Sequence, residues 1–236
     1  MKFSVIIPAY NEEKLLPKTL RAVGAAAAGL SCEIIVVDNE STDKTAQIAA
    51  GFGAKVVSES EHNIAQVRNT GAKASSGDVL IFIDADTIVR PALFQKIERR
   101  MKDEKCFGGA VSVEYGEFQK KWMKYYLFAW KFWETFFNMK MGAAQFCLKA
   151  VFEKLGGYDK SIFVGEDIEF YWRLAKFARR GGGHLFFVRE PKVKTSARRL
   201  DKISFLQTFV LMNPIYIRLN WRKKSLWKAW YEKTIR

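Results

Sequence analysis

The chain has 236 residues, 49% of them hydrophobic and 27% charged, which suits one globular domain with or without an appendage. Three widely spaced cysteines (Cys32, Cys106 and Cys147) exclude a visible disulfide framework or zinc-binding spacing and indicate reduced thiols in a cytoplasmic protein. The 39 Lys and Arg outnumber the 25 Asp and Glu, and a formal net charge of +14 favours a polyanionic partner: nucleic acid, an anionic membrane surface or a phosphorylated substrate.

The first residues and the hydropathy of the chain bear on where the protein works. The N-terminal apolar run, residues 5–7, is short and acidic residues follow it, so no signal peptide is expected. No stretch approaches the roughly 18 uninterrupted apolar residues of a membrane-spanning helix. We therefore expect a cytoplasmic protein, soluble or peripheral on the inner face of the membrane. A solvated basic surface with no dedicated partner is the alternative interpretation of the charge.

Strand-like and helix-like patterns alternate through residues 1–105. Short apolar, β-branched runs predict buried parallel strands at residues 3–7, 33–37, 55–57 and 79–83. Helical patterns lie between them, at residues 12–28, 42–51, 64–74 and 91–102. This alternation predicts an α/β fold with a doubly wound, mostly parallel sheet of Rossmann-like type and helices on both faces. Ligands of such sheets bind beyond the carboxyl ends of the strands.

The pattern changes after residue 105. A strand is expected at residues 107–115, an aromatic-rich helix at 118–141, a short strand at 145–148 and a helix at 149–155. A loop that carries glycine and aspartate leads into an amphipathic helix at about residues 167–178, and a strand follows at 184–188. A tail that mixes Trp and Tyr with Lys and Arg fills residues 203–236.

Polar residues follow the first two predicted strands. Residues 8–13 (PAYNEE) could shape a ledge on which a base stacks, although a capped helix start would look the same. Asp38 follows the second strand and is placed to accept hydrogen bonds from a ribose or a base. No G-x-G-x-x-G follows the first strand and no Walker A sequence occurs, which argues against sites for NAD, FAD and P-loop nucleotides.

The fourth predicted strand ends in Asp84-Ala85-Asp86. Acids that directly follow a buried strand emerge at the ligand edge, where two neighbouring carboxylates cost several kcal/mol to bury without a cation. A hard cation such as Mg²⁺ or Mn²⁺ relieves that repulsion and binds through one or two carboxylates plus substrate phosphates. A solvated turn with two acids is the equally weighted alternative.

Four segments, in this order and spacing, together resemble the family-two glycosyltransferases, which have the GT-A fold: PAYNEE, VVDNESTDKT, NIAQVRNTGAKASSGD before IDADT, and GGYDKSIFVGEDIEFYWRL. The resemblance covers residues 3 to 178. It implies an inverting glycosyltransferase with a nucleotide-sugar donor linked to UDP, GDP or dTDP. It also implies a Mg²⁺ or Mn²⁺ ion that holds the diphosphate of the donor.

The resemblance also implies roles for single residues. The nucleoside would be cradled by Pro8, Tyr10, Glu12 and Asp38. The rest of the nucleotide-sugar would be contacted by Arg68, Asp84, Ala85 and Glu166, with Asp84 on the ribose or the metal. The metal ligand that bridges to the diphosphate would be Asp86.

Asp167 matches the acid that serves as general base in this family. Direct displacement at the anomeric carbon requires the acceptor hydroxyl to lose its proton as it attacks from the face opposite the leaving diphosphate. A metal stabilises the charge on that diphosphate, so no acid need protonate it. The alternative for Asp167 is an acidic first turn of a helix, favoured by the macrodipole. Downstream, Arg198 or Arg199 could pair with the diphosphate, or belong to an ordinary basic loop.

Two departures from the family pattern matter. Where the family usually has Asp-Asp-Gly-Ser, this chain has Asp38-Asn39-Glu40-Ser41, so the turn lacks its glycine and one acid and the nucleotide identity stays open. No Gln-x-x-Arg-Trp follows the general base, which disfavours processive polymer synthases. Transfer of a single sugar is expected.

The resemblance suggests a division of the chain. Residues 1–200 would form the GT-A catalytic domain, with a nucleotide-binding half at 1–105 and an acceptor half at 106–200. Residues 201–236 would form a basic, aromatic, helical extension.

Two functions of other classes compete with the assignment as a glycosyltransferase: a non-catalytic nucleotide-sugar-binding protein, which intact Asp86 and Asp167 disfavour, and a nucleic-acid-binding protein. Because the clustered acids would repel phosphates without a metal and no nucleic-acid-binding motif is evident, no nucleic acid partner is expected.

Two aromatic, basic segments suggest attachment to an anionic membrane surface and a lipid-linked or membrane-proximal acceptor, whose identity the sequence leaves open. In the first, one helical face would carry Trp122, Tyr126, Trp133 and Phe137, and another Lys120, Lys124 and Lys131. This face could equally be an acceptor cleft or pack in the core. In the tail, a shared face would carry Trp227, Trp230 and Tyr231, and the alternative is a helix that packs these aromatics against the catalytic domain.

Overall fold

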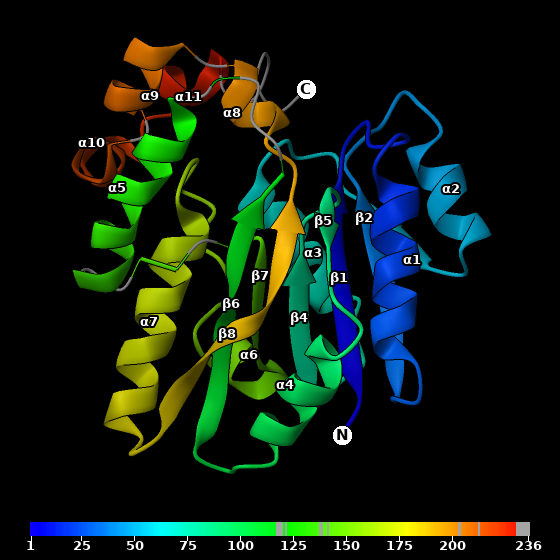
Figure 1. The fold of residues 1–236 in the computed structure, drawn as a ribbon. Helices are drawn as coiled ribbons and strands as arrows, with labels where there is room; N and C mark the ends of the chain where they lie inside the picture. The colour runs from blue at the N-terminus through cyan, green and yellow to red at the C-terminus, as the bar shows by residue number, and fades with distance from the viewer. Residues whose placement is uncertain are drawn as a thin grey trace.

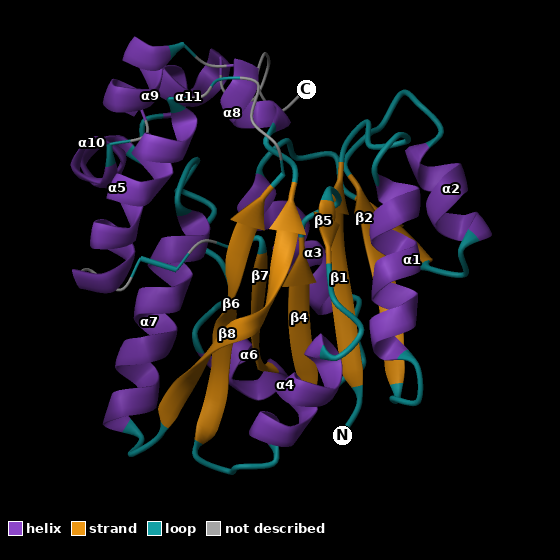
Figure 2. Ribbon diagram, in the orientation of Figure 1, coloured by secondary structure: helices purple, strands orange, loops and turns teal. Residues whose placement is uncertain are grey.

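We describe the protein from a computed structural model, which covers residues 1–116, 120, 122–136, 139–140, 142–202, 204–211 and 213–229. Within these residues, one eight-stranded sheet has the strand order β3-β2-β1-β4-β7-β6-β8-β5, and helices cover both of its faces (Figures 1 and 2). The strands are β1 (Phe3–Ala9), β2 (Cys32–Asp38), β3 (Lys55–Ser58), β4 (Val79–Ile83), β5 (Thr87–Ile88), β6 (Cys106–Tyr115), β7 (Ala144–Leu148) and β8 (His184–Thr195).

The described helices fall into two groups. Seven precede the last strand: α1 (Leu16–Ala27), α2 (Thr45–Gly51), α3 (Ile64–Lys73), α4 (Leu93–Met101), α5 (Met123–Phe136), α6 (Lys149–Lys154) and α7 (Glu166–Arg180). Four short ones follow the last strand: α8 (Arg198–Lys202), α9 (Phe205–Leu211), α10 (Pro214–Asn220) and α11 (Lys224–Ala229). In Figure 1, α5 and α8 to α11 gather at one corner, beyond the carboxyl ends of the strands.

The predicted parallel half of the sheet is confirmed. β1 pairs in parallel with β2 and with β4, and β2 pairs in parallel with β3. The first helix begins at Leu16 rather than at residue 12, because Pro17 is tolerated in the first turn of a helix but not in its interior. Similarly, α2 and α4 begin at Thr45 and Leu93, two or three residues later than their patterns predict.

The second half makes the sheet mixed. β7 lies antiparallel between β4 and β6, and β8 runs parallel to β6. The two-residue β5, which the prediction lacked, adds an antiparallel edge against β8. β8 continues to Thr195 rather than ending at residue 188, because its register against β6 shifts between Val111 and Val113 and pairing then resumes.

Side chains alternate between the two faces of the sheet, as the period of a strand requires. In β4, Val79, Ile81 and Ile83 join the cluster that packs under α1 and α4, whereas Leu80 and Phe82 join the cluster under α3, α6 and α7. The second cluster holds α3 very close to the sheet. A Cβ atom at Gly71 of α3 would lie 2.9 Å from Cγ2 of Val37. This close approach fixes the distance between α3 and the sheet, and with it the position of Arg68, which α3 carries.

A third cluster joins α5 and α7 to the C-terminal helices. It contains Trp130, Ile168, Ile217, Trp221 and Trp227, and Tyr126 and Trp133 pack against it. Trp227 is only 1% exposed, and its indole Nε1 donates to the carbonyl oxygen of Asn220 at 2.9 Å. For Trp227 the structure therefore favours the core alternative over a membrane contact. Three further aromatics of the expected faces, Phe137, Trp230 and Tyr231, lie outside the described residues.

No helix among the described residues combines the length and apolar character that a membrane crossing would need.

Candidate active site

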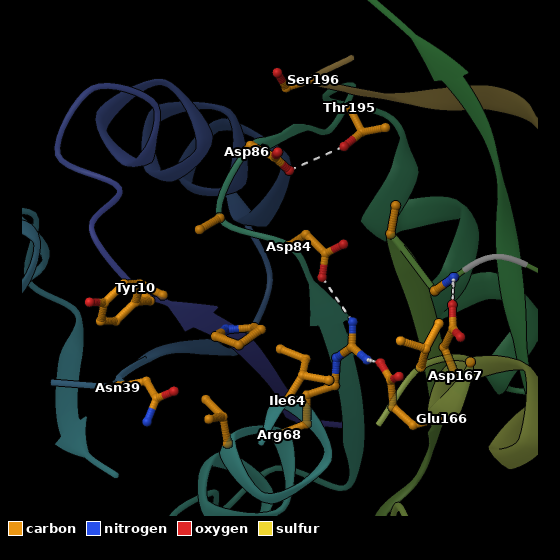
Figure 3. Close-up of a pocket in the computed structure, with 18 of the residues that line it drawn as sticks. Tyr10, Asn39, Ile64, Arg68, Asp84, Asp86, Glu166, Asp167, Thr195 and Ser196 are labelled. Atoms are coloured by element: carbon orange, nitrogen blue, oxygen red, sulfur yellow. Dashed lines mark hydrogen bonds and ion pairs between the residues drawn. The ribbon is translucent and has the colours of Figure 1, made fainter. Parts of the chain in front are cut away.

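A cavity of about 280 Å³ opens at the carboxyl ends of β1 and β4 (Figure 3). It brings together nine of the residues that the sequence singled out: Pro8, Tyr10, Glu12, Arg68, Asp84, Ala85, Asp86, Glu166 and Asp167. The position agrees with the rule that ligands of open α/β sheets bind beyond the carboxyl ends of the strands. Asp38 lies beside the cavity but is not part of its lining, and the side chain of Arg199 lies outside the described part of the structure.

Arg68 is the buried cation at the centre of this site, only 4% exposed. Its Nη2 atom donates to Oδ1 of Asp84 at 2.9 Å, and Nη1 donates to Oε1 of Glu166 (Figure 3). Burial alone would lower the pKa of Arg68, but the carboxylates of Asp84 and Glu166 raise it above its ordinary value. The guanidinium therefore stays charged and joins the end of β4 to the start of α7. Its Nε atom is buried without a hydrogen-bond partner.

Asp167 lies in the first turn of α7, where the helix begins after Gly165 in a left-handed conformation (φ 83°). Its Oδ2 atom accepts a hydrogen bond from the backbone N–H of Gly142 at 2.5 Å, and Oδ1 accepts one from the N–H of Ile168 at 2.8 Å. A Cβ atom at Gly142 would lie 2.6 Å from Oδ2 of Asp167. Only glycine therefore lets the segment before β7 approach Asp167 closely enough to orient its carboxylate.

The two acids at the start of α7 do not titrate like exposed carboxyls. Burial raises the pKa of Glu166 to about 7, and the nearby Asp167 raises it too, while the charge of Arg68 acts in the opposite direction. Burial likewise raises the pKa of Asp167, against the influence of Arg68 and of its two backbone hydrogen bonds. A carboxylate with a raised pKa is a stronger base, which is what the deprotonation of a hydroxyl requires.

If Asp167 is the general base that the sequence resemblance implies, these shifts predict how activity should depend on pH. A base works only when deprotonated, so activity should fall as the pH drops through the raised pKa of Asp167. The acid limb of kcat/KM should then lie above 3.8, the ordinary value for an aspartate. The measurement is kcat/KM across the pH range at constant ionic strength. Activity that persists down to the pKa of an ordinary aspartate would contradict the assignment of Asp167 as the base.

Asp86 is held at the other acidic corner of the cavity. Its Oδ1 atom accepts a hydrogen bond from the hydroxyl of Thr195 at 3.1 Å (Figure 3). Its Oδ2 atom lies 3.5 Å from Nε of Arg198, and the same guanidinium pairs with Glu12. The guanidinium of Arg198, from the C-terminal side of the chain, thus bridges Glu12 and Asp86, two acids of the N-terminal half. Thr195, the last residue of β8, was not anticipated.

The acids of the cavity offer the oxygen ligands that a divalent cation prefers. Among the described residues, no three His, Cys, Asp or Glu side chains converge as a metal cage. Mg²⁺ and Mn²⁺ do not need one, because phosphate oxygens and water complete a site built on one or two carboxylates. Asp86, which already attracts the guanidinium of Arg198, fits this requirement, and Asp84 lies two residues away.

The opposite end of the cavity is lined by two aromatic rings, from Tyr10 and His62, and by the side-chain amide of Asn39. The rings of Tyr10 and His62 meet edge to face with their centroids 5.8 Å apart. Asn39 donates from Nδ2 to the carbonyl oxygens of Glu59 and Glu61, and its Oδ1 lies 3.2 Å from Nδ1 of His62. This aromatic wall suits a flat heterocycle, because an aromatic ring can stack on any nucleobase. Sequence analysis missed His62, although it lies in the loop after the third strand, at the ligand edge.

The turn that follows β2 carries Glu40 at a position of left-handed backbone. Glu40 adopts a left-handed conformation (φ 59°), which a glycine would adopt without strain. Its carboxylate lies 3.1 Å from Nε2 of His62. The residue that replaces glycine therefore contacts the aromatic end of the cavity.

Comparisons with known proteins agree with this fold. Residues 1–236 resemble the S. aureus protein TarS 1–349 with a TM-score of 0.66 and 19% identity, over 84% of this chain and 61% of that one. They resemble the mannosyltransferase PcManGT from Pyrobaculum calidifontis, solved with GDP-Man and Mn²⁺, with a TM-score of 0.64 and 18% identity, over 82% and 56% of the two chains. The fold is the GT-A fold of glycosyltransferases, as the sequence predicted.

Sequence comparison shows the family. A model described as "Glycosyl transferase family 2" matches residues 4–156, so the chain belongs to glycosyl transferase family 2. The dolichol-phosphate mannosyltransferase of Pyrococcus furiosus is 34% identical over 108 residues, which are 44% of this chain and 31% of that protein. The chain thus spans about a third of the length of this curated relative.

Proposed function

We propose that this protein is a metal-dependent, inverting glycosyltransferase that moves a single sugar from a nucleotide-sugar to an acceptor hydroxyl. The observation that carries the proposal is one cavity faced by an aromatic wall, by the metal-binding candidate Asp86 and by the backbone-oriented acid Asp167. These are the three components that such a transfer needs: a binding surface for the nucleobase, a positive charge beside the diphosphate and a general base that deprotonates the acceptor hydroxyl.

The donor would lie along the cavity from the aromatic end to Asp86. Pro8, Tyr10 and His62 would contact the nucleobase, with Asn39 beside them, and Glu12 would lie between the nucleobase and the diphosphate. The diphosphate would then reach the corner where Asp86 and Arg198 meet. The guanidinium of Arg198 could exchange its carboxylate partners for phosphate oxygens, since both offer the same bidentate geometry. UDP, GDP and dTDP are the candidate nucleotides.

A bound Mg²⁺ or Mn²⁺ would neutralise charge that develops on the leaving diphosphate. Asp86 would hold it, with Asp84 as a further ligand or as a ribose contact. The structure of PcManGT with GDP-Man and Mn²⁺ supports a metal in a protein of this fold. Asp84 would be kept in place by Arg68, and this would make Arg68 a positioning residue rather than a direct contact of the nucleotide.

Asp167 would take the proton from the acceptor hydroxyl. The N–H groups of Gly142 and Ile168 orient its carboxylate, and burial makes it more basic. Attack from the face opposite the diphosphate inverts the anomeric centre. Because Glu166 is paired with Arg68, it would organise the site and leave Asp167 as the base.

The acceptor would enter over an apolar wall. Four apolar side chains that line the cavity, Phe163, Val164, Ile168 and Ile217, also pack in one cluster that includes the residue next to Asp167 in α7. They suit an amphipathic acceptor better than a free sugar, and this supports a lipid-linked or membrane-proximal acceptor. The relative named a dolichol-phosphate mannosyltransferase is consistent with that class. Leu200 and Ile217 also make the helices after residue 197 part of the cavity, which supports a catalytic unit that includes them.

A ligand panel tests the proposal. Thermal denaturation should be measured with UDP-, GDP- and dTDP-sugars, each with and without Mn²⁺. One nucleotide class should stabilise the protein only when Mn²⁺ is present, by about 2.7 kcal/mol at a ligand concentration of about 100 Kd. An oligonucleotide serves as the control and should not stabilise the protein. Stabilisation by the oligonucleotide but by no nucleotide-sugar would overturn the proposal in favour of nucleic-acid binding.

A further inference from the structure

The outer face of α5 carries an exposed aromatic stripe. Tyr125, Phe128, Phe132 and Phe136 are 79%, 75%, 52% and 71% exposed. At 100° per residue the four fall within an arc of about 80° on the helix. They expose on the order of 500 Å² of aromatic surface, since each such side chain carries roughly 150–250 Å². Contiguous apolar patches of this size mark interaction sites.

The stripe is separate from the face that packs inward. Met123, Tyr126, Trp130 and Trp133 turn toward the C-terminal helices and the loop before α7. The expected membrane face of this helix, Trp122, Tyr126 and Trp133, is thus mainly its inner face. The packing of α5 on its neighbours therefore does not depend on the exposed aromatic side chains.

Exposed apolar side chains are concentrated in this corner of the molecule. Among the described residues, eleven large apolar side chains are exposed, and nine belong to α5, α9, α10 and α11: Tyr125, Phe128, Phe132, Phe136, Phe205, Val210, Ile215, Leu219 and Leu226. Figure 1 shows these helices together at one corner. The rest of the described surface contributes only Met1 and Phe52.

The positive charge around the stripe favours an anionic partner. Residues 120–140 contain five Lys and one acid, and residues 202–229 contain six Lys and Arg and no acid. Lys124 is exposed on the flank of the stripe, and Arg218, Lys223 and Lys224 are exposed on the neighbouring helices. Two copies of this face would bring like charges together, whereas an anionic bilayer takes up both the cations and the aromatic rings.

We propose that α5 docks the protein on an anionic lipid bilayer through Tyr125, Phe128, Phe132 and Phe136, with the basic residues of α5, α10 and α11 on the phosphate headgroups. The same helix packs with its inner face on Ile168 and Ile217, which line the apolar part of the cavity. Docking would thus bring that part of the cavity close to the bilayer. The surface lies apart from the donor site, and its test needs no sugar transfer.

The test is sedimentation of the full chain with vesicles. Phosphatidylcholine vesicles that contain phosphatidylglycerol should carry the protein into the pellet at low salt, and pure phosphatidylcholine vesicles should carry little. The variant Y125Q/F128Q/F132Q/F136Q should lose at least about tenfold in its partition to the anionic vesicles, because interfacial aromatics supply much of such binding. Since these side chains are exposed, its thermal denaturation midpoint should stay near that of the wild type.

Phe52→Gln is the matched control, because Phe52 is exposed on α2's C-terminal end, away from this corner, and it should sediment like the wild type. Wild-type protein that stays in the supernatant, or a fourfold variant that pellets fully, would overturn the proposal. So would a wild-type dimer that the same substitutions convert to a monomer, since the face would then join two copies. Nucleotide-sugar stabilisation, measured on the same samples, reports separately on the donor site.

Discussion

Replacing Asp167 by asparagine should leave nucleotide-sugar binding intact and slow sugar transfer about 10²- to 10⁴-fold, the usual contribution of a general base. Asparagine has nearly the same shape but keeps only one acceptor oxygen, so either the N–H of Gly142 or that of Ile168 loses its side-chain acceptor. It has no basic carboxylate, so it cannot take the acceptor's proton. The loss should appear in kcat, measured as transfer to an acceptor or to water at saturating donor.

Asp103→Asn provides the matched control, because this aspartate is exposed and lies outside the cavity. It should transfer sugar at the wild-type rate. The thermal denaturation midpoint of Asp167→Asn, with and without donor, distinguishes a catalytic defect from a folding defect. A fully active Asp167→Asn variant would refute the role of Asp167 as base.

Asp86→Ala should abolish the Mn²⁺-dependent part of donor binding. In the wild type, nucleoside diphosphate at about 100 Kd with Mn²⁺ should raise the free energy of unfolding by about 2.7 kcal/mol. Without the Asp86 carboxylate the ion would lose its proposed main protein ligand, and the diphosphate would meet Glu12 with less positive charge between them. The measurement is the denaturation midpoint with nucleoside diphosphate, with and without Mn²⁺.

Thr195→Val is the control for Asp86→Ala. It removes the hydroxyl that donates to Asp86 but leaves the carboxylate in place. Its stabilisation by nucleoside diphosphate should still depend on Mn²⁺. If Asp86→Ala keeps the full Mn²⁺-dependent stabilisation, the metal is held elsewhere and the assignment of Asp86 is wrong.

The first half of the fold could be predicted because its strands are short apolar runs separated by helical patterns. Strands buried on both faces, such as Val79–Ile83, produce that signal directly. The second half could not be predicted to the same extent. β5 has only two residues, and β8 passes through Arg189, Glu190 and Pro191, which interrupt its apolar pattern. Long-range pairing with β6 before and after these residues, at Val188 and at Val193, keeps the strand continuous.

The candidate site, like the fold, could be predicted from the sequence only in part. Residues directly after strands, such as Tyr10, Asp84 and Asp86, were found because the end of a buried strand fixes where they emerge. His62 and Thr195 were missed, since each contributes through contacts with side chains distant in sequence. The pairing of Arg68 with both Asp84 and Glu166 could not be foreseen either, because it depends on how closely α3 and α7 approach the end of β4.

The central claim is inverting transfer that depends on both a metal and Asp167, and the anomeric configuration of the product tests it most directly. The donor found by the ligand panel should be incubated with the protein and Mn²⁺ in water, and the released sugar followed by NMR before it mutarotates. The account predicts that an α-linked donor first releases the β-anomer. Release should stop when Mn²⁺ is chelated and should fall about 10²- to 10⁴-fold in Asp167→Asn. Initial release of the α-anomer, or release that is indifferent to Asp167, would contradict the account.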